Sequence, residues 1–237
     1  MQEFNEQTNF QEGVVLYIDK PLEWSSFDVV HKIRNLIRKH FGLKWIKVGH
    51  AGTLDPLATG LMIICTGSET KNIRRYLDYG KEYIATICLG KTTPSFDLET
   101  MVDHTYSIDH ITNQLIMETI PQFIGIQHQV PPLFSAKWMN GKRAYDLARE
   151  GKEIEMEPKE IRIDRIEFID YKPPALTLKI RCSKGTYIRA LARDIGKSLN
   201  SGGHLLELRR TAIGDIHVSM AWSVQEFEEN LKKIVTN

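Results

Sequence analysis

Residues 47–61 read KVGHAGTLDPLATGL and form a loop-like segment between two apolar, strand-like runs. Its three glycines and one proline exclude regular helix or strand, because glycine frees the φ angle and proline fixes it. Asp55 is its only acidic residue, and His50 lies five positions before it. A single carboxylate on a shaped backbone suits an active-site loop. On the residues alone, a turn in which Asp55 caps a backbone N–H is an equal alternative.

The composition is that of an ordinary globular protein. Of the 237 residues, 42% are hydrophobic and 26% are charged, both usual values. The three cysteines lie far apart and show no spacing typical of zinc ligands, so we expect reduced core residues and no bound metal. No apolar run approaches the roughly 18 residues that cross a bilayer. We therefore expect a cytoplasmic monomer that binds no membrane.

The charges are segregated along the chain, although the net charge is only +1. Residues 31–47 hold six Lys and Arg residues and no acid, whereas acids gather at 150–160 and 226–229. Further basic residues are Lys71, Arg74, Arg75, Lys137, Lys142, Arg143, Arg181, Lys184, Arg189 and Arg193. A basic face of this kind fits a polyanion such as nucleic acid, and solvated helix faces are the alternative for any one group.

Periodic patterns predict a mixture of helices and strands. Apolar runs predict strands over 13–18, 61–65, 81–89, 161–170, 175–182, 204–210 and 213–218. Helices are predicted over 68–78 and 186–199 and after the capping residues Ser25, Ser107 and Ser223. Asn140-Gly141 predicts a hairpin, followed by a short helix that ends near Gly151. Because helices and strands do not alternate strictly, the pattern favours an α+β fold with a mixed sheet.

Four segments together carry a resemblance to a known family. They are the stretch around Asp55, Asp19-Lys20-Pro21, Lys81-Glu82-Tyr83 and Ser183–Arg189. In this order they resemble the TruB-type tRNA pseudouridine synthases, over about residues 13–220. The resemblance implies a mixed, largely antiparallel central sheet flanked by helices, the pseudouridine synthase fold. It also implies an enzyme without cofactor or metal that isomerises the T-loop uridine at position 55 of tRNA.

The resemblance also implies a domain organisation. Residues 1–12 would be a polar N-terminal tail, and residues 13–237 a single catalytic domain. An insertion at about 124–152 would close on the RNA.

Three residues receive catalytic roles from the resemblance. Asp55 matches the family's essential aspartate, a nucleophile or an anion that holds the separated fragments while the N1–C1′ bond breaks and C5 joins C1′. Tyr83 matches a tyrosine that stacks beneath the target base. Arg189 matches an arginine that pairs with the aspartate in a pocket closed to water. From the residues alone, Tyr83 could be a core tyrosine and Arg189 an exposed helix cation.

Other residues match groups that hold the RNA. The target uridine must be flipped out of a folded loop, and His50 matches a histidine that fills the vacated space. Leu208 matches an apolar residue that packs on the base. Lys20 belongs to a Lys-Pro motif that we expect to hold the catalytic loop more than to touch RNA. The T arm of tRNA would be gripped largely through its phosphates and shape, by side chains that include Tyr187, Arg143 and Lys137.

Two features depart from the family pattern. Glu23 stands where the pattern Asp-Lys-Pro-x-Gly-x-Ser-Ser has glycine. If that position takes a positive φ, Glu23 must be strained or the turn must differ. Many relatives also carry a small RNA-binding domain at the C-terminus, and fewer than 20 residues follow Val218 here. We therefore expect a short form whose recognition is centred on the T arm.

Two alternative functions stay open at this point. The enzyme could pseudouridylate another structured RNA loop, or the chain could be an RNA-binding or tRNA-folding module without essential catalysis. The presence of Asp55, Tyr83 and Arg189 together argues against binding alone, because gripping phosphates requires none of them.

Overall fold

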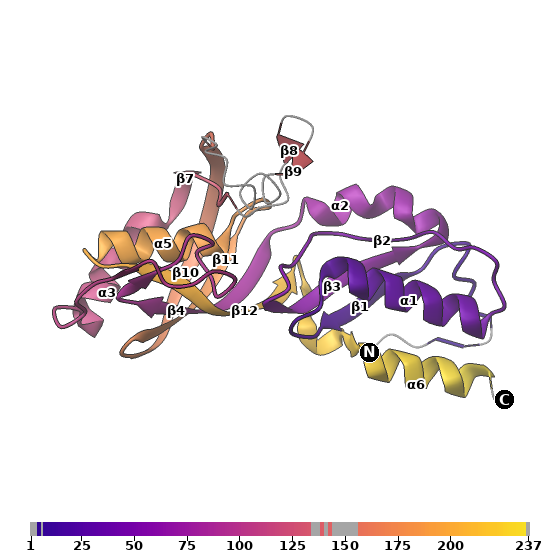
Figure 1. Ribbon diagram of the computed structural model, residues 1–237. Coiled ribbons are helices and arrows are strands. Elements are labelled where there is room, and N and C mark those ends of the chain that lie inside the picture. Colours follow the sequence, from indigo (N-terminus) through magenta and orange to yellow (C-terminus); the bar gives the residue numbers. More distant parts are fainter. Residues whose placement is uncertain (1–3, 6, 134–137, 140–141, 144–155, 236–237) are drawn as a thin grey trace. The chain divides into compact units, whose positions relative to one another are not determined.

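The computed structural model describes residues 4–5, 7–133, 138–139, 142–143 and 156–235 (Figure 1). The chain divides into two compact units, unit 1 with residues 1–83 and 208–237, and unit 2 with residues 84–207. The boundaries fall within two strands, β4 (Lys81–Leu89) and β12 (Gly203–Ile213). The expectation of a single catalytic domain over 13–237 stays a prediction.

Unit 1 contains a mixed sheet in which strand β3 is central. Strand β3 spans Ala58–Thr66. The other strands are β1 (Val15–Lys20), β2 (Val48–His50), β13 (Ile216–His217) and β14 (Trp222–Ser223). Along one edge β3 pairs antiparallel with β1, which in turn runs parallel to β14. Along the other, residues 58–60 pair in parallel with β12, and residues 64–66 pair antiparallel with β2. Residues 48–50 and 58–61 lie in β2 and β3, so the exclusion of regular strand from residues 47–61 is wrong at both ends of that segment. The residues between the two strands, which include Asp55, are therefore anchored on the sheet at both ends.

The helices predicted after Ser25 and Ser223 begin there, but the helix predicted over 68–78 is a 3-10 turn followed by a short α-helix. Unit 1 contains α-helices and 3-10 turns. They are α1 (Ser26–His40), the 3-10 turn η1 (Gly67–Asn72), α2 (Ile73–Leu77), the 3-10 turn η3 (Val218–Met220) and α6 (Val224–Val235). The predicted capping box of α1 is confirmed, because Ser25 accepts from Asp28 N and Asp28 accepts from Ser25 N at 2.8 Å. Helices α1 and α6 lie side by side (Figure 1), joined at their surface by the Lys32–Glu228 ion pair.

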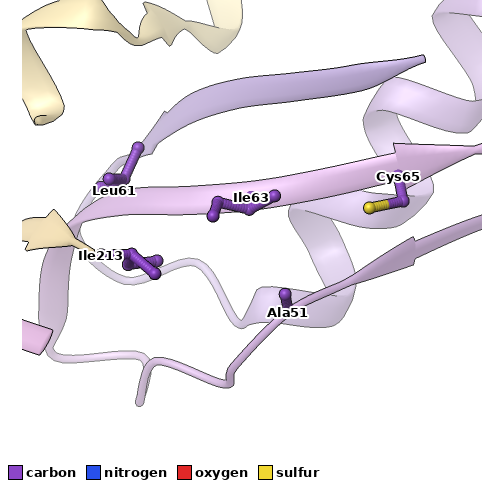
Figure 2. Packing of buried hydrophobic residues seen from close by; sticks show 5 residues of the cluster. All are labelled: Ala51, Leu61, Ile63, Cys65 and Ile213. Atoms are coloured by element: carbon purple, nitrogen blue, oxygen red, sulfur yellow. The ribbon is translucent and has the colours of Figure 1, made fainter. Parts of the chain in front are cut away.

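A fully buried cluster packs behind the loop that holds Asp55. Leu61, Ile63 and Cys65 of β3, Ile213 of β12 and Ala51 at the start of the loop have no exposed surface (Figure 2). The predicted core role of the cysteines is confirmed, since Cys65, Cys88 and Cys182 are all free and buried. Because the methyl group of Ala51 is part of this core, the loop begins from a fixed point rather than from solvent.

Unit 2 contains an antiparallel sheet in the order β4, β11, β10, β7. Its elements besides β4 are β5 (Lys91–Thr92), β6 (His104–Thr105), α3 (Asn113–Thr119), the 3-10 turn η2 (Ile120–Phe123), β7 (Gly125–Gln129), β8 (Trp138–Met139), β9 (Lys142–Arg143), β10 (Lys159–Lys172), β11 (Ala175–Cys182) and α5 (Ile188–Ser198). The predicted hairpin of β10 and β11 is confirmed. Taken with the two parallel strand pairs of unit 1, this confirms the expected mixed, largely antiparallel α+β fold.

Two predicted elements are wrong in their bounds. Ser107 does not cap a helix: its hydroxyl accepts the N–H of Asp109 in a local turn, and α3 begins after Thr112, whose side chain accepts from Leu115 N. The strand predicted over 213–218 is interrupted, because the chain turns after Ile213 and only β13 follows. In both places a short polar side chain or a turn satisfies the backbone locally.

The hairpin predicted at Asn140-Gly141 lies partly outside the described residues, as does the short helix predicted to end near Gly151. The strands β8 and β9 on either side of Asn140-Gly141 pair with each other, Trp138 with Arg143 and Met139 with Lys142.

The segment assigned to a polar tail contributes to the core of unit 1. Phe10 is only 2% exposed, and its carbonyl accepts a hydrogen bond from the Thr66 hydroxyl at 2.8 Å. Phe4 packs against the rings of Phe10, Trp222 and Phe227. Two aromatic side chains therefore hold this segment on the unit.

Candidate active site

The Asp loop, residues 51–57, connects β2 to β3. Ala51 donates its N–H to the carbonyl of Ile63 at 2.9 Å, and Ala58 donates its N–H to the carbonyl of Asp55 at 3.0 Å. Asp55 itself is half-buried. The backbone on both sides of Asp55 is thus hydrogen-bonded, which restricts where the carboxylate can point.

A buried serine of α1 holds the residue before Asp55. The hydroxyl of Ser26 accepts the N–H of Leu54 at 2.8 Å and donates to the carbonyl of Leu54 at 2.9 Å. Ser26 is 3% exposed and Leu54 is 4% exposed. One hydroxyl therefore satisfies both backbone groups of Leu54, which have no access to water.

Lys20 holds the Asp loop from the end of β1. Its side chain is fully buried, and its ammonium group donates to the carbonyls of Trp24 at 2.5 Å, Pro21 at 2.9 Å and Pro56 at 3.2 Å. Lys20 therefore contacts the Asp loop at Pro56, and its role in holding a catalytic loop stays a prediction. Burial lowers the pKa of Lys20 from 10.5 to about 8; the carboxylate of Asp55 opposes this change, and the charge of Arg210 adds to it.

Glu23 adopts the backbone conformation that glycine favours. Its φ angle is 66°, in the left-handed region, and its N–H donates to the carbonyl of Pro56 at 2.9 Å. Of the two outcomes expected for this position, strain rather than a different turn is the one observed. The Lys20 ammonium group and the Glu23 N–H share the carbonyl of Pro56, so this strained turn is tied directly to the Asp loop.

Arg210 is a site residue that the sequence analysis missed. It is 1% exposed and donates from Nη2 to the carbonyl of Gly52 in the Asp loop at 3.1 Å, and from Nε to the carbonyl of Leu61 at 2.7 Å. It also hydrogen-bonds the side chain of Tyr83, which is 8% exposed. The available signal was weak: Arg210 ends the strand predicted over 204–210, which also contains the charged residues Glu207 and Arg209.

The residues predicted to contact the base lie around the same loop in unit 1. Leu208 is half-buried and pairs across β12 and β3 with Ala58, which follows the Asp loop directly. His50 ends β2, and its Nδ1 is buried without a hydrogen-bond partner among the described residues. Burial, followed by the charge of Arg210, lowers the pKa of His50, while the backbone of Gly52 opposes this. The lowered pKa favours the neutral form of the His50 ring, which is suited to stacking.

Arg189 lies in unit 2 and has an acidic partner that the sequence analysis did not name. Its Nη1 lies 3.4 Å from Oδ2 of Asp97 and donates to the carbonyl of Ser95 at 3.3 Å. The side chains of Arg189 and Asp97 are 6% and 7% exposed. The alternative of an exposed helix cation is therefore wrong, whereas the pairing of Arg189 with Asp55 stays a prediction. Asp97 lies 92 residues before Arg189, and no local pattern connects them.

The other residues predicted to bind RNA also belong to unit 2. Tyr187 precedes α5, and the side chain of Gln129 accepts its N–H at 2.8 Å and donates to its carbonyl at 3.1 Å. Arg143 ends β9, and Lys137 lies outside the described residues. Their roles stay predictions.

In the part of the chain that the structure describes, no helix is long and apolar enough to cross a membrane. The same residues include no group of three or more His, Cys, Asp or Glu side chains placed to hold a metal ion.

Two solved structures share the fold of this chain. The chain resembles one in the "Crystal Structure of a Cbf5-Nop10-Gar1 Complex", with a TM-score of 0.67 and 24% identity over 93% of this chain and 54% of the other. A chain in the "Crystal structure of the archaeal box H/ACA sRNP Nop10-Cbf5 complex" gives a TM-score of 0.65 and 21% identity over 97% and 62%. The chain thus spans little more than half of the first neighbour. The fold is the expected pseudouridine synthase fold.

The sequence comparisons identify the family. The description "TruB family pseudouridylate synthase (N terminal domain)" matches residues 38–188, and "tRNA pseudouridylate synthase B C-terminal domain" matches residues 189–235. Proteins named tRNA pseudouridine synthase B are 57% identical in Phocaeicola vulgatus, covering 93% of this chain and 94% of theirs, and 50% identical in Flavobacterium johnsoniae, covering 94% and 98%. The chain belongs to the TruB family of pseudouridylate synthases.

One relative is longer than this chain. The protein named tRNA pseudouridine synthase B in Dechloromonas aromatica is 45% identical over 90% of this chain but only 69% of its own length. The segment that matches the family's C-terminal domain here contains most of α5 and all of β12 and α6.

Proposed function

We propose that this enzyme converts the uridine at position 55 in the T loop of tRNA to pseudouridine. The observation that supports the proposal is the Asp loop, whose carbonyls at Leu54, Pro56 and Gly52 accept hydrogen bonds from the side chains of Ser26, Lys20 and Arg210, respectively. The names of relatives that match more than nine-tenths of the chain support tRNA as the substrate, and the motif resemblance supports the T-loop uridine at position 55. We further propose that the enzyme acts as a cytoplasmic monomer without a metal or cofactor.

Asp55 is the group on which the reaction depends. Isomerisation breaks the bond between N1 of uracil and C1′ of the ribose, turns the base and forms a bond between C5 and C1′. A carboxylate can serve as the nucleophile or as the anion that holds the separated fragments. The anchored loop supports this role, because a preplaced charge needs no reorganisation during the reaction. Arg189 would pair with Asp55 and keep it ionised away from water.

The flipped base would be held by side chains around the Asp loop. Tyr83 and Leu208 would pack against the base, and the neutral ring of His50 would stack in the space that the uridine leaves. Tyr187, Arg143 and Lys137 would contact the RNA backbone of the T arm, with the basic residues of α1 and α2 adding affinity that depends on salt.

Tritium release tests the proposal. The full-length protein is incubated with tRNA transcripts carrying tritium at C5 of uridine, and release to solvent is measured while the product is mapped by position. We expect one equivalent of tritium from the T-loop uridine in the wild type and none in Asp55→Asn. Asp215→Asn is the matched control, because Asp215 is an exposed turn residue of the same unit.

The outcomes separate the alternatives. Release from a different RNA loop would assign another substrate to the same chemistry. RNA binding without release in the wild type would leave a binding or folding module. Release that persists in Asp55→Asn would remove Asp55 from the mechanism, and unchanged release in Arg189→Ala would remove the proposed ion pair.

A further inference from the structure

Arg210 is the largest of the fully buried side chains among the described residues, with 1% of its surface exposed. Within those residues it forms no salt bridge with a carboxylate. A guanidinium group stays charged at any ordinary pH. Removing such a charge from water is costly unless strong acceptors replace the water. The hydrogen-bond acceptors of Arg210 must therefore compensate for the water that its guanidinium group has lost.

The contacts of Arg210 converge on the candidate active site. Nε donates to the carbonyl of Leu61 in the central strand, and Nη2 donates to the carbonyl of Gly52 in the Asp loop, at 2.7 and 3.1 Å. The remaining contact is a hydrogen bond with the side chain of Tyr83. A single rigid group thus connects the sheet, the loop that carries Asp55 and the tyrosine predicted to lie under the base.

The backbone of Arg210 is also placed closely. Gly60 pairs with Arg210 across β3 and β12 and has a φ of +107°. A Cβ atom at Gly60 would lie 2.7 Å from the Arg210 N atom, which is too close for two non-bonded atoms. Only glycine permits the backbones of residues 60 and 210 to approach this closely, so Gly60 fixes the position of the Arg210 backbone against β3.

The charge of Arg210 acts on its neighbours. It lowers the pKa of both Lys20 and His50. Burial lowers the pKa of Arg210 itself, and Tyr83 opposes this through its charge and its hydrogen bond. A guanidinium group hydrogen-bonded to the side chain of Tyr83 stabilises negative charge on the phenol oxygen. Asp55 and Asp28 also act on this set, because their carboxylates raise the pKa of Lys20.

The reaction needs a proton acceptor after the new bond has formed. Once C5 is bonded to C1′, the hydrogen on C5 leaves as a proton, and N1 gains a proton, so the uracil ring is unchanged in composition. An ordinary tyrosine, with a pKa near 10, is a poor acceptor at neutral pH. A guanidinium group held against the phenol oxygen would change that.

We propose that Arg210 is a positioning residue for the isomerisation: it holds the oxygen of Tyr83 in place and stabilises the phenolate that accepts the proton leaving C5. The proposal rests on the function proposed above. Because Arg210 hydrogen-bonds both the Gly52 carbonyl and Tyr83, it also fixes the position of the Asp loop relative to Tyr83. Arg210 itself touches no reacting atom.

A spectroscopic titration tests the proposal without using activity. Phenolate formation is followed by ultraviolet absorbance near 295 nm in the wild type, Tyr83→Phe and Arg210→Lys. Among the eight tyrosines, we expect one to ionise well below pH 10 in the wild type. That step should be absent in Tyr83→Phe and move to higher pH in Arg210→Lys. If the wild type and Tyr83→Phe titrate identically below pH 10, the proposal is wrong, whether or not Arg210→Lys folds.

Single-turnover kinetics supply the second readout. Arg210→Lys should slow tritium release by about 100-fold while binding tRNA within about twofold of the wild type, and the low-pH limb of its rate profile should shift to higher pH. The double variant Arg210→Lys/Tyr83→Phe should release tritium no more slowly than Tyr83→Phe, because both substitutions act on the same proton acceptor. Arg209→Lys is the matched control, since Arg209 lies next to Arg210 and instead pairs with Asp19. Multiplicative effects of the two changes would overturn the proposal, whereas absence of release in the wild type would overturn only the proposed function.

Discussion

Glu23→Gly should make this protein more stable. Glu23 has a φ of 66°, and its exposed side chain makes no hydrogen bond or ion pair that would hold it there, as far as the described residues show. A side chain in the left-handed region costs about 1–2 kcal/mol, and glycine removes this cost. Glycine also gives the unfolded chain more freedom, which offsets about 0.5–1 kcal/mol of the gain. The free energy of unfolding should therefore rise by about 0.5–1 kcal/mol.

Urea unfolding at 25 °C measures the change, with calorimetry as a second method. For a chain of this length, 1 kcal/mol corresponds to a shift of about 2–4 °C in the unfolding midpoint. Glu23→Ala is the matched control, because alanine keeps the Cβ atom and so keeps the strain, while it also removes the carboxylate. The alanine variant should resemble the wild type within about 0.5 kcal/mol.

The comparison of the two variants decides whether the turn stores strain. A glycine variant that is no more stable than the alanine variant would refute the reasoning. It would mean that the hydrogen bond from Glu23 N to the carbonyl of Pro56, rather than the φ angle, determines the energy of this turn.

Three further predictions follow from buried groups. Lys20 has a pKa of about 8 in the folded chain and 10.5 ordinarily, so the unfolded chain binds more protons between these two pH values. The free energy of unfolding of the wild type should therefore rise relative to that of Lys20→Gln as the pH increases from 8 to 10. A difference between the two proteins that stays constant with pH in urea unfolding would contradict this. Asp97→Asn breaks a buried ion pair and should lower the free energy of unfolding by about 3 kcal/mol, with a loss below 1 kcal/mol indicating that the pair is well solvated. Gly60→Ala places a Cβ atom against the Arg210 backbone, whereas Gly125 has a similar positive φ but open space around it. Gly60→Ala should lower the free energy of unfolding by about 3 kcal/mol and Gly125→Ala by about 1 kcal/mol. Equal losses of stability would show that φ strain alone matters.

Local patterns predicted most of the elements of the fold. The capping boxes at Ser25 and Ser223, the strands β1, β4 and β11 and the hairpin of β10 with β11 all depend on residues within a few positions of each other. Ser107 misled the prediction because a serine can accept an N–H in a turn as well as at a helix start. The motif around Asp55 likewise identified the family without any structure.

The sequence by itself identified the family and the candidate residue, Asp55 in a glycine-rich loop. The tertiary structure alone decided how that loop is held, because its anchors come from strands and helices that are distant in the sequence. Lys20 contacts Pro56, and Arg210 reaches Gly52 from 158 positions away. A buried cation must find carbonyls or carboxylates wherever the fold provides them. That choice depends on three-dimensional burial, which no spacing along the chain records.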